Sequence, residues 1–225
     1  MMYQGNFTHD LVEDIEKLES VQDDSGRFYN TPYGKMASVT TVTGWEKQKF
    51  FAKWRKENPK ESRRVCSRGN YLHNAIEQYL LNNEVTEDQL PGGSKYLFAQ
   101  MKESLDKIDN IRALEASLWS KSTTLAGRVD CVGEYDGELS IIDFKGATRK
   151  KRIRDIDNYF MQATAYAIAW QERVEQPVNQ IVILIAAEDG ANQVFKSTPQ
   201  LHTKSLLEAI KKYNEHFAQQ QGQLW

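Results

Sequence analysis

The sequence predicts an α/β fold in which a mixed sheet is flanked by helices. In the first half, apolar residues recur at three- and four-residue spacings, which is typical of amphipathic helices. From residue 113 onward, strand-like stretches appear and then alternate with helical ones. The run "QIVILIAA" at 180–187 is almost wholly apolar, as expected of a strand covered on both faces. With 225 residues the chain is long enough for one domain with a sizeable core.

The N-terminal region differs in character from the rest. Residues 1–35 are polar and carry Gly and Pro, and we interpret them as a loosely ordered lead-in with one short helix near 11–18. Residues 36–225 then form a single domain. Its first helix starts at Thr43, a residue type that caps helices, and ends before Pro59.

The remaining elements follow from periodicity and turn signals. Residues 62–82 and 94–108 fit amphipathic helices on either side of a Pro-Gly-Gly turn. The expected later elements are strands at 113–120, 127–135, 139–145 and 180–187, and helices at 157–173 and 201–221.

Composition excludes several classes of protein. The sequence has no apolar run of about 18 residues, so we expect no transmembrane helix and no membrane partner. The first 25 residues lack the apolar stretch of a secretory signal. The two cysteines, Cys66 and Cys131, are too few for a four-thiolate iron–sulfur cluster. We therefore expect a cytoplasmic protein, of a bacterial or phage-infected cell.

The net charge of −2 hides an uneven distribution. Residues 145–154 read "KGATRKKRIR", with six basic side chains and no acid, and residues 47–68 form a second basic region. Such runs fit a nucleic-acid backbone, although a solvated surface gives the same pattern.

The stretch "GRVDCVGEYDGELSIIDFKG" predicts a hairpin with an Asp-Gly turn at 136–137. If Tyr135 faces Glu138, the same register places Asp130 opposite Asp143. Opposed residues point to the same face, with Cβ atoms about 4.5–5.5 Å apart.

Two carboxylates at that spacing repel each other unless a cation lies between them. Mg²⁺ suits the position because it prefers oxygen ligands and keeps places for water and phosphate. Lys145 lies two residues beyond Asp143 and shares its face. Alternatively, Asp130 and Asp143 lie on the wet face of a plain hairpin, but the apolar residues around Asp143 argue against that.

"RVD" followed by "IIDFK" resembles the PD-(D/E)XK nuclease superfamily in its RecB-like branch. Two other features of that branch are present in the right order. "RGNYLHNAIEQYL" supplies His73, and "QATAY" supplies Gln162 and Tyr166. The resemblance implies a restriction-endonuclease-like core with an N-terminal helical region.

The segments "VTTVTGWEKQKFFAKWRKE", "IRALEASLWS" and the hairpin are further similar to the mitochondrial genome maintenance exonuclease family and its phage and bacterial relatives. This similarity runs from about Ser38 to Ala187. It implies a metal-dependent exonuclease that prefers single-stranded DNA ends. The family usually continues D-(F/W)-K-T-S, whereas Gly146 and Ala147 follow Lys145 here, so the local phosphate contact departs from the pattern.

The resemblance also implies roles for individual residues. A Mg²⁺ or Mn²⁺ ion is expected on His73, Asp130, Asp143 and the backbone carbonyl of Phe144. Lys145 is expected to position the attacking water or offset charge on the phosphate. Gln162 and Tyr166, one helical turn apart, are expected to complete the catalytic set.

Two glutamates have supporting roles in this hypothesis. Glu77 follows His73 by four residues on a helix and is expected to orient its ring. Glu115, at the start of a strand, is either a further ligand or an exposed strand residue.

The expected DNA contacts are basic and aromatic. Aromatic side chains among lysines suit stacking on unpaired bases, although we expect at least two of Trp45, Phe50, Phe51 and Trp54 to pack into the core instead. The predicted DNA-binding residues are Arg149, Lys150, Lys151, Arg152, Arg154, Arg68 and Trp54.

Three functions stay open. The leading one is a monomeric deoxyribonuclease that hydrolyses phosphodiesters from single-stranded ends. The second is an endonuclease of the same fold that cuts duplex or branched DNA. The third is a non-catalytic DNA-binding module, against which the intact Asp–Asp–Lys set argues.

Overall fold

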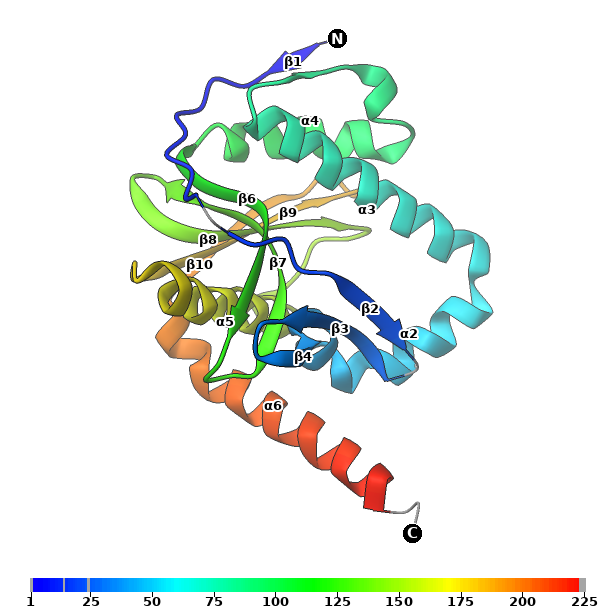
Figure 1. The fold of residues 1–225 in the computed structure, drawn as a ribbon. Helices are drawn as coiled ribbons and strands as arrows, with labels where there is room; N and C mark the ends of the chain where they lie inside the picture. Colours follow the sequence, from blue (N-terminus) through cyan, green and yellow to red (C-terminus); the bar gives the residue numbers. More distant parts are fainter. Residues whose placement is uncertain (1, 14, 24, 223–225) are drawn as a thin grey trace.

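The computed structural model describes residues 2–13, 15–23 and 25–222 (Figure 1). One large mixed sheet runs through the molecule in the order β10-β9-β8-β7-β4-β3-β2, and β6 also pairs with β7. The α/β prediction is therefore confirmed. The strands are β1 (Tyr3–Gln4), β2 (Ser20–Asp23), β3 (Gly26–Thr31), β4 (Gly34–Ser38), β5 (Glu84–Val85), β6 (Ile108–Ser120), β7 (Leu125–Tyr135), β8 (Glu138–Ala147), β9 (Gln180–Ala187) and β10 (Asn192–Ser197).

Helices cover both faces of the sheet. The helices are α1 (Val39–Thr43), α2 (Trp45–Glu57), α3 (Pro59–Leu80), α4 (Gly93–Leu105), α5 (Asp157–Val174) and α6 (Pro199–Gly222). Two short 3-10 turns lie at Glu87–Gln89 and Ile153–Asp155. The helix predicted between Thr43 and Pro59 is present as α2, and the short helix α1, which was not predicted, precedes it across Gly44.

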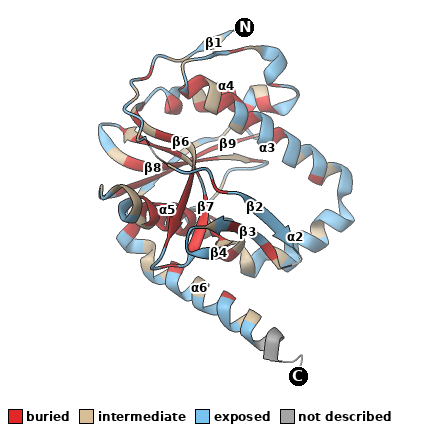
Figure 2. Cartoon of the chain, in the orientation of Figure 1, coloured by how far each residue is buried: buried red, intermediate tan, exposed pale blue. Residues whose placement is uncertain are grey.

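Strand β9 divides the core into two layers. Ile181, Ile183 and Ile185 pack with residues of α5 and α6, whereas Val182 and Leu184 pack with residues of α3 and α4. All eight residues of β9 are buried, because β8 and β10 pair with its two edges and helices cover its two faces (Figure 2). This confirms the strand predicted from the apolar run.

The hairpin register is the one that the Asp-Gly turn predicts. Tyr135 pairs with Glu138, and the ladder continues to Cys131 opposite Ile142. Asp136 and Gly137 both have positive φ, 51° and 81°, as a tight two-residue hairpin turn requires. The next step beyond the ladder brings Asp130 and Asp143 to the same level of β7 and β8.

Strand β6 is irregular where it passes this level. Its register with β7 shifts between Asp109 and Ala113, and Glu115 has a φ of 46° in the middle of the strand. A positive φ is uncommon for a non-glycine residue and turns the side chain out of the regular alternation. The flanking pairs are Leu114 with Cys131 and Ala116 with Val129, so Glu115 comes level with Asp130.

The N-terminal region differs from the expected lead-in. Its described residues contain β1 to β3 and part of β4, and no helix forms near 11–18. Phe7 packs in the α3–α4 layer, and Leu18 and Tyr29 pack against Trp119 in a small separate cluster. The residues against which these side chains pack lie far along the chain, so local periodicity did not reveal the contacts. None of the described helices is long and apolar enough to cross a membrane.

Candidate metal centre

Three neighbouring strands each contribute one carboxylate at the same level. Glu115 comes from β6, Asp130 from β7 and Asp143 from β8. Asp130 is central because β7 pairs with both other strands. Like charges in adjacent positions are unfavourable without a positive partner. The arrangement is therefore typical of a site for a cation.

Helix α3 places His73 beside two of these carboxylates. The Nδ1 atom of His73 lies 3.7 Å from Asp130 Oδ2 and 4.0 Å from Glu115 Oε1. One ligand atom each from His73, Glu115 and Asp130 lie within 4.8 Å of one another. Burial lowers the pKa of His73, but the charge of Asp130 and the contact with Glu115 outweigh this and raise it above its ordinary value.

Asp130 is held in place by the neighbouring strand. The backbone N–H of Phe144 donates a hydrogen bond to its Oδ2 atom, at 2.9 Å. This contact fixes the carboxylate against β8, next to Asp143. The expected ligand role of the Phe144 carbonyl stays a prediction.

Asp143 is buried and has one oxygen without a partner. Lys145 Nζ donates to Oδ1 at 2.5 Å, whereas Oδ2 is buried and has no hydrogen-bond partner among the described residues. Burial raises the pKa of Asp143, Lys145 lowers it and Asp130 raises it again, with a net upward shift. A buried carboxylate oxygen without a donor is costly, and a cation would satisfy it.

Lys145 carries a stable positive charge in this setting. Burial lowers its pKa, but Asp143 and Asp130 outweigh that effect and raise it above the ordinary value. Its Nζ atom also lies 5.2 Å from the centre of the Tyr159 ring. Sequence reasoning missed Tyr159, although it precedes Gln162 by three residues and so lies on the same face of α5.

The two α5 residues predicted from the sequence are buried behind the strands. Gln162 is buried, and no hydrogen bond fixes its amide to another described residue. The hydroxyl of Tyr166 lies against Gly127 of β7, where a Cβ atom would come within 2.6 Å of it. Burial raises the pKa of Tyr166 well above its usual value, and the charge of Asp130 adds to this.

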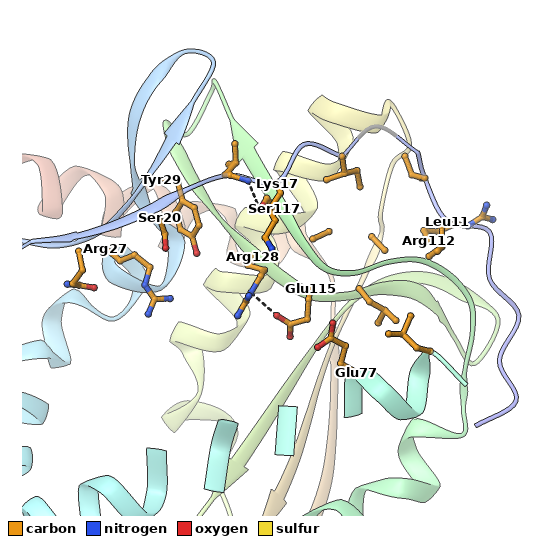
Figure 3. Close-up of a pocket in the computed structure, with 18 residues that line it drawn as sticks. Leu11, Lys17, Ser20, Arg27, Tyr29, Glu77, Arg112, Glu115, Ser117 and Arg128 are labelled. Carbon is orange, nitrogen blue, oxygen red and sulfur yellow. Dashed lines mark hydrogen bonds and ion pairs between the residues drawn. The ribbon is translucent and has the colours of Figure 1, made fainter. Parts of the chain in front are cut away.

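Arg128 is a second residue to which sequence reasoning assigned no role. Its Nε atom lies 2.7 Å from Glu115 Oε2, so a guanidinium contacts one member of the metal-ligand cluster (Figure 3). Glu77 lies beside Glu115, and burial and that neighbour raise its pKa. Among the described residues, His73 makes its ion-pair contacts with Glu115 and Asp130 and none with Glu77, so the orienting role expected of Glu77 stays a prediction.

The donor set fits a divalent ion. Carboxylate oxygens suit Mg²⁺ and Mn²⁺, and an imidazole nitrogen suits the transition metals. The clustered atoms of His73, Glu115 and Asp130, together with the unpartnered oxygen of Asp143, offer both kinds of ligand.

Backbone hydrogen bonds hold the basic segment after β8 in place. The N–H of Lys150 donates to Asp189, and Lys151 exchanges hydrogen bonds with the Gln193 side chain. Arg152 pairs with Asp155 at 2.9 Å. The exposed side chains are those of Arg149, Lys150, Arg152 and Arg154, while Lys151 is partly buried.

Arg68 does not fit the role expected of it. Its side chain is buried and forms an ion pair with Glu188, which Arg64 also contacts. The guanidinium therefore ties α3 to the end of β9 instead of lying on the surface. Because Glu188 lies far along the chain, the local run of basic residues gave no sign that Arg68 is paired and buried.

Three of the four aromatic residues of α2 lie outside the core, so the expectation that at least two pack into it is wrong. The helix has no buried residue, and Phe50 and Phe51 are 67% and 45% exposed. Trp54 is partly exposed. Only Trp45 is packed, against Tyr213 and Phe217 of α6.

Comparison with known proteins agrees with this geometry. Residues 46–223 match the model of the PD-(D/E)XK nuclease superfamily, which is most of the chain. The chain is also similar to mitochondrial genome maintenance exonuclease 1 of Xenopus tropicalis, with 32% identity over 130 residues. The corresponding proteins of Mus musculus and Homo sapiens are 28% and 27% identical over 134 and 131 residues. Each match covers 56% of this chain but only 38% of the relative.

Proposed function

The chain belongs to the PD-(D/E)XK nuclease superfamily, and on that basis we propose that it is a metal-dependent deoxyribonuclease that removes nucleotides from single-stranded DNA ends. One observation carries the proposal. Buried Asp143, with one oxygen free and the other on Lys145, lies beside the cluster of His73, Glu115 and Asp130. The name of the matched relatives, exonucleases of genome maintenance, supports the choice of DNA ends.

In this proposal His73, Glu115, Asp130 and Asp143 hold a Mg²⁺ or Mn²⁺ ion, and the Phe144 carbonyl contributes a further oxygen. Such an ion polarises the scissile phosphate and lowers the pKa of a bound water. Arg128 and the Phe144 N–H fix the orientation of two of the carboxylates, Glu115 and Asp130, before substrate arrives. A pre-oriented site costs less reorganisation during the reaction.

Lys145 acts as a cation and a hydrogen-bond donor. Its raised pKa keeps the ammonium charged at neutral pH, so it offsets charge that develops on the phosphate and holds the attacking water. The water oxygen bonds to phosphorus, the bond to the leaving oxygen breaks, and the water proton ends on the leaving group or solvent. Gln162 and Tyr166 support this wall of the site from α5.

In this proposal two groups of residues hold the DNA. The exposed cations among residues 149–154 follow the catalytic strand directly and are proposed to bind backbone phosphates. On α2 the exposed rings of Phe50 and Phe51, with Trp54, are proposed to stack on bases. Stacking on exposed rings requires unpaired bases, which supports a single-stranded substrate.

The test uses Asp143→Ala, with Glu138→Ala as the control because Glu138 is an exposed acid of the same strand. Each protein is incubated with linear single-stranded, linear duplex and circular single-stranded DNA, and with single-stranded RNA, in Mg²⁺, Mn²⁺ or EDTA. We expect degradation of linear single-stranded DNA alone by the wild type and the control, and none with EDTA or Asp143→Ala.

Other outcomes would change the assignment. Cutting of the circle would indicate an endonuclease. Binding without cleavage in either metal would indicate a non-catalytic module. Full activity of a folded Asp143→Ala protein would refute the metal site, and a thermal melt of each variant checks that it is folded.

A further inference from the structure

An open cavity of about 970 Å³ lies beside the candidate metal centre. Glu115 and Arg128 line it from β6 and β7, and Arg27 and Tyr29 line it from β3 (Figure 3). This volume is at the upper end of the range for small-ligand pockets, so the cavity is large enough for a nucleotide unit. Because Glu115 also belongs to the metal-ligand cluster, an occupant of the cavity lies next to that centre.

Arg27 is a cation of this cavity that has no charge partner among the described residues. Two other arginines of the wall are paired, Arg112 with Asp10 and Arg128 with Glu115. The Arg27 side chain is exposed and makes no ion pair or hydrogen bond with another described residue. Its backbone is fixed, because its N–H donates to Thr41 Oγ1 at 3.1 Å and its strand pairs with β2. A fixed backbone with an uncommitted guanidinium is suited to an anionic ligand.

Besides Arg27, Tyr29 is a second residue of β3 that lines this cavity. The two residues are two positions apart on β3 and therefore share a face. Both Arg27 and Tyr29 affect the pKa of Tyr166, which lies against Gly127 of β7. Its pKa is raised first by burial and then by Asp130 and Tyr29, whereas Arg27 lowers it. Arg27 and Tyr29 also line the same cavity as Glu115 of the metal-ligand cluster.

A second cavity, of about 270 Å³, continues on the other side of Arg27. It shares Gln22 and Arg27 with the first cavity, and Lys47, Phe51 and Arg55 of α2 line it. Arg27 therefore lies at the junction of two cavities that lead from the metal-ligand cluster to α2. Cations occur along both, and an exposed aromatic ring lies at the far end.

We propose that the two cavities hold successive nucleotides of the substrate strand and that Arg27 binds the phosphate between them. The proposal rests on the proposed deoxyribonuclease function and adds a path for the strand across β3 to α2. A guanidinium can hold a phosphate through two parallel hydrogen bonds, which fixes the register of the strand relative to the reacting phosphate. Arg27 is then a DNA-binding residue that determines which linkage enters the metal centre.

The experiment pairs protein variants with modified DNA. Binding of a short single-stranded oligonucleotide is measured in EDTA, with one uncharged methylphosphonate placed at each linkage in turn. The proteins are the wild type, Arg27→Gln, Arg27→Lys and the control Lys35→Gln. Lys35 lies on the same group of strands but is paired with Asp23 and lines neither cavity. Cleavage of the unmodified strand in Mn²⁺ is measured in parallel.

We expect Arg27→Gln to weaken binding of the unmodified strand about tenfold, as loss of one charged hydrogen-bonding partner does. The dependence of log K on log salt should become shallower by about 0.7, the value for one phosphate on a single strand. One methylphosphonate position should weaken binding to the wild type and to Lys35→Gln, yet have no further effect on Arg27→Gln. Arg27→Lys should restore part of the affinity.

Two failures are distinguishable. If Arg27→Gln keeps the wild-type sensitivity at every linkage, the phosphate contact is refuted even when the wild type cleaves DNA. If the wild type binds with the expected pattern but cleaves nothing, the proposed enzymatic function fails and the strand path stands. A wild type that does not bind the strand overturns both.

Discussion

The contact between Tyr166 and Gly127 gives a sharp prediction about the wall of the candidate site. A Cβ atom at position 127 would lie 2.6 Å from the Tyr166 hydroxyl oxygen, and 3.0 and 3.2 Å from two ring carbons. Favourable contacts between such atoms are about 3.5–4.0 Å, so the ring would have to move by about 1 Å. Both residues are buried, and Tyr166 of α5 is packed in the core, so its ring has little freedom to move.

We expect Gly127→Ala to lower the free energy of unfolding by about 1–2 kcal/mol. Overpacking of a buried site costs about 1–3 kcal/mol. The alanine also restricts the unfolded chain, which offsets about 0.4–1 kcal/mol of that cost. Because Gly127 lies three residues before Asp130 on β7, the substitution should also lower DNA cleavage while leaving DNA affinity nearly unchanged.

The assay is urea unfolding of a double-mutant cycle. Tyr166→Phe removes the oxygen that makes the closest contact, and the next atom lies at 3.0 Å. Phenylalanine at 166 should therefore relieve part of the strain, and the double variant should be more stable than the sum of the single effects by about 1 kcal/mol. Unchanged stability of Gly127→Ala, or strictly additive effects, would show that the ring is not confined as described.

Two further predictions concern the metal and pH. Glu115→Gln should weaken Mn²⁺ binding about tenfold or more in calorimetric titration, and Glu77→Gln should weaken it clearly less. The reason is that Glu115 belongs to the ligand cluster and Glu77 does not. Equal losses of Mn²⁺ affinity in the two variants would contradict this. Hydrogen bonds from Arg64 and Arg68 hold the pKa of Glu188 down to about 2, from an ordinary 4.5. A lowered folded-state pKa contributes stability above the unfolded pKa that is lost as pH falls. Glu188→Gln should therefore cost stability at neutral pH, and its difference from the wild type should shrink as pH falls from about 4.5 to about 2.

The parts of the fold that the sequence predicted correctly rest on local chemistry. The Asp-Gly turn set the register of β7 and β8, and this brought Asp130 and Asp143 to one level. The 3.6-residue pattern predicted α3, whose residue His73 reaches the same site. In both cases the information lies within a few residues of the feature it determines.

The features that sequence reasoning missed depend on partners far along the chain. Strand β4 pairs in parallel with β7, Ala37 opposite Leu125, and a local pattern carries no signal of such a partner. The four residues of β2 are all exposed, so that strand shows no apolar alternation at all. Arg68 is buried only because Glu188 is supplied from the end of β9.

The irregularity of β6 explains why Glu115 was left undecided from the sequence. In a regular strand its side chain would follow the alternation of its neighbours, and the sequence gives no reason to break it. The positive φ at Glu115 re-aims the side chain, and Arg128, two residues before Asp130 on β7, then holds it. Strained backbone of this kind costs about 1–3 kcal/mol and persists where the surrounding structure enforces it. The strain, the carboxylate repulsion and the unpartnered oxygen of Asp143 all fall in one place, and a single divalent cation would relieve the last two. Because two of these three unfavourable terms share one remedy, the site is better explained by binding a cation than by folding alone.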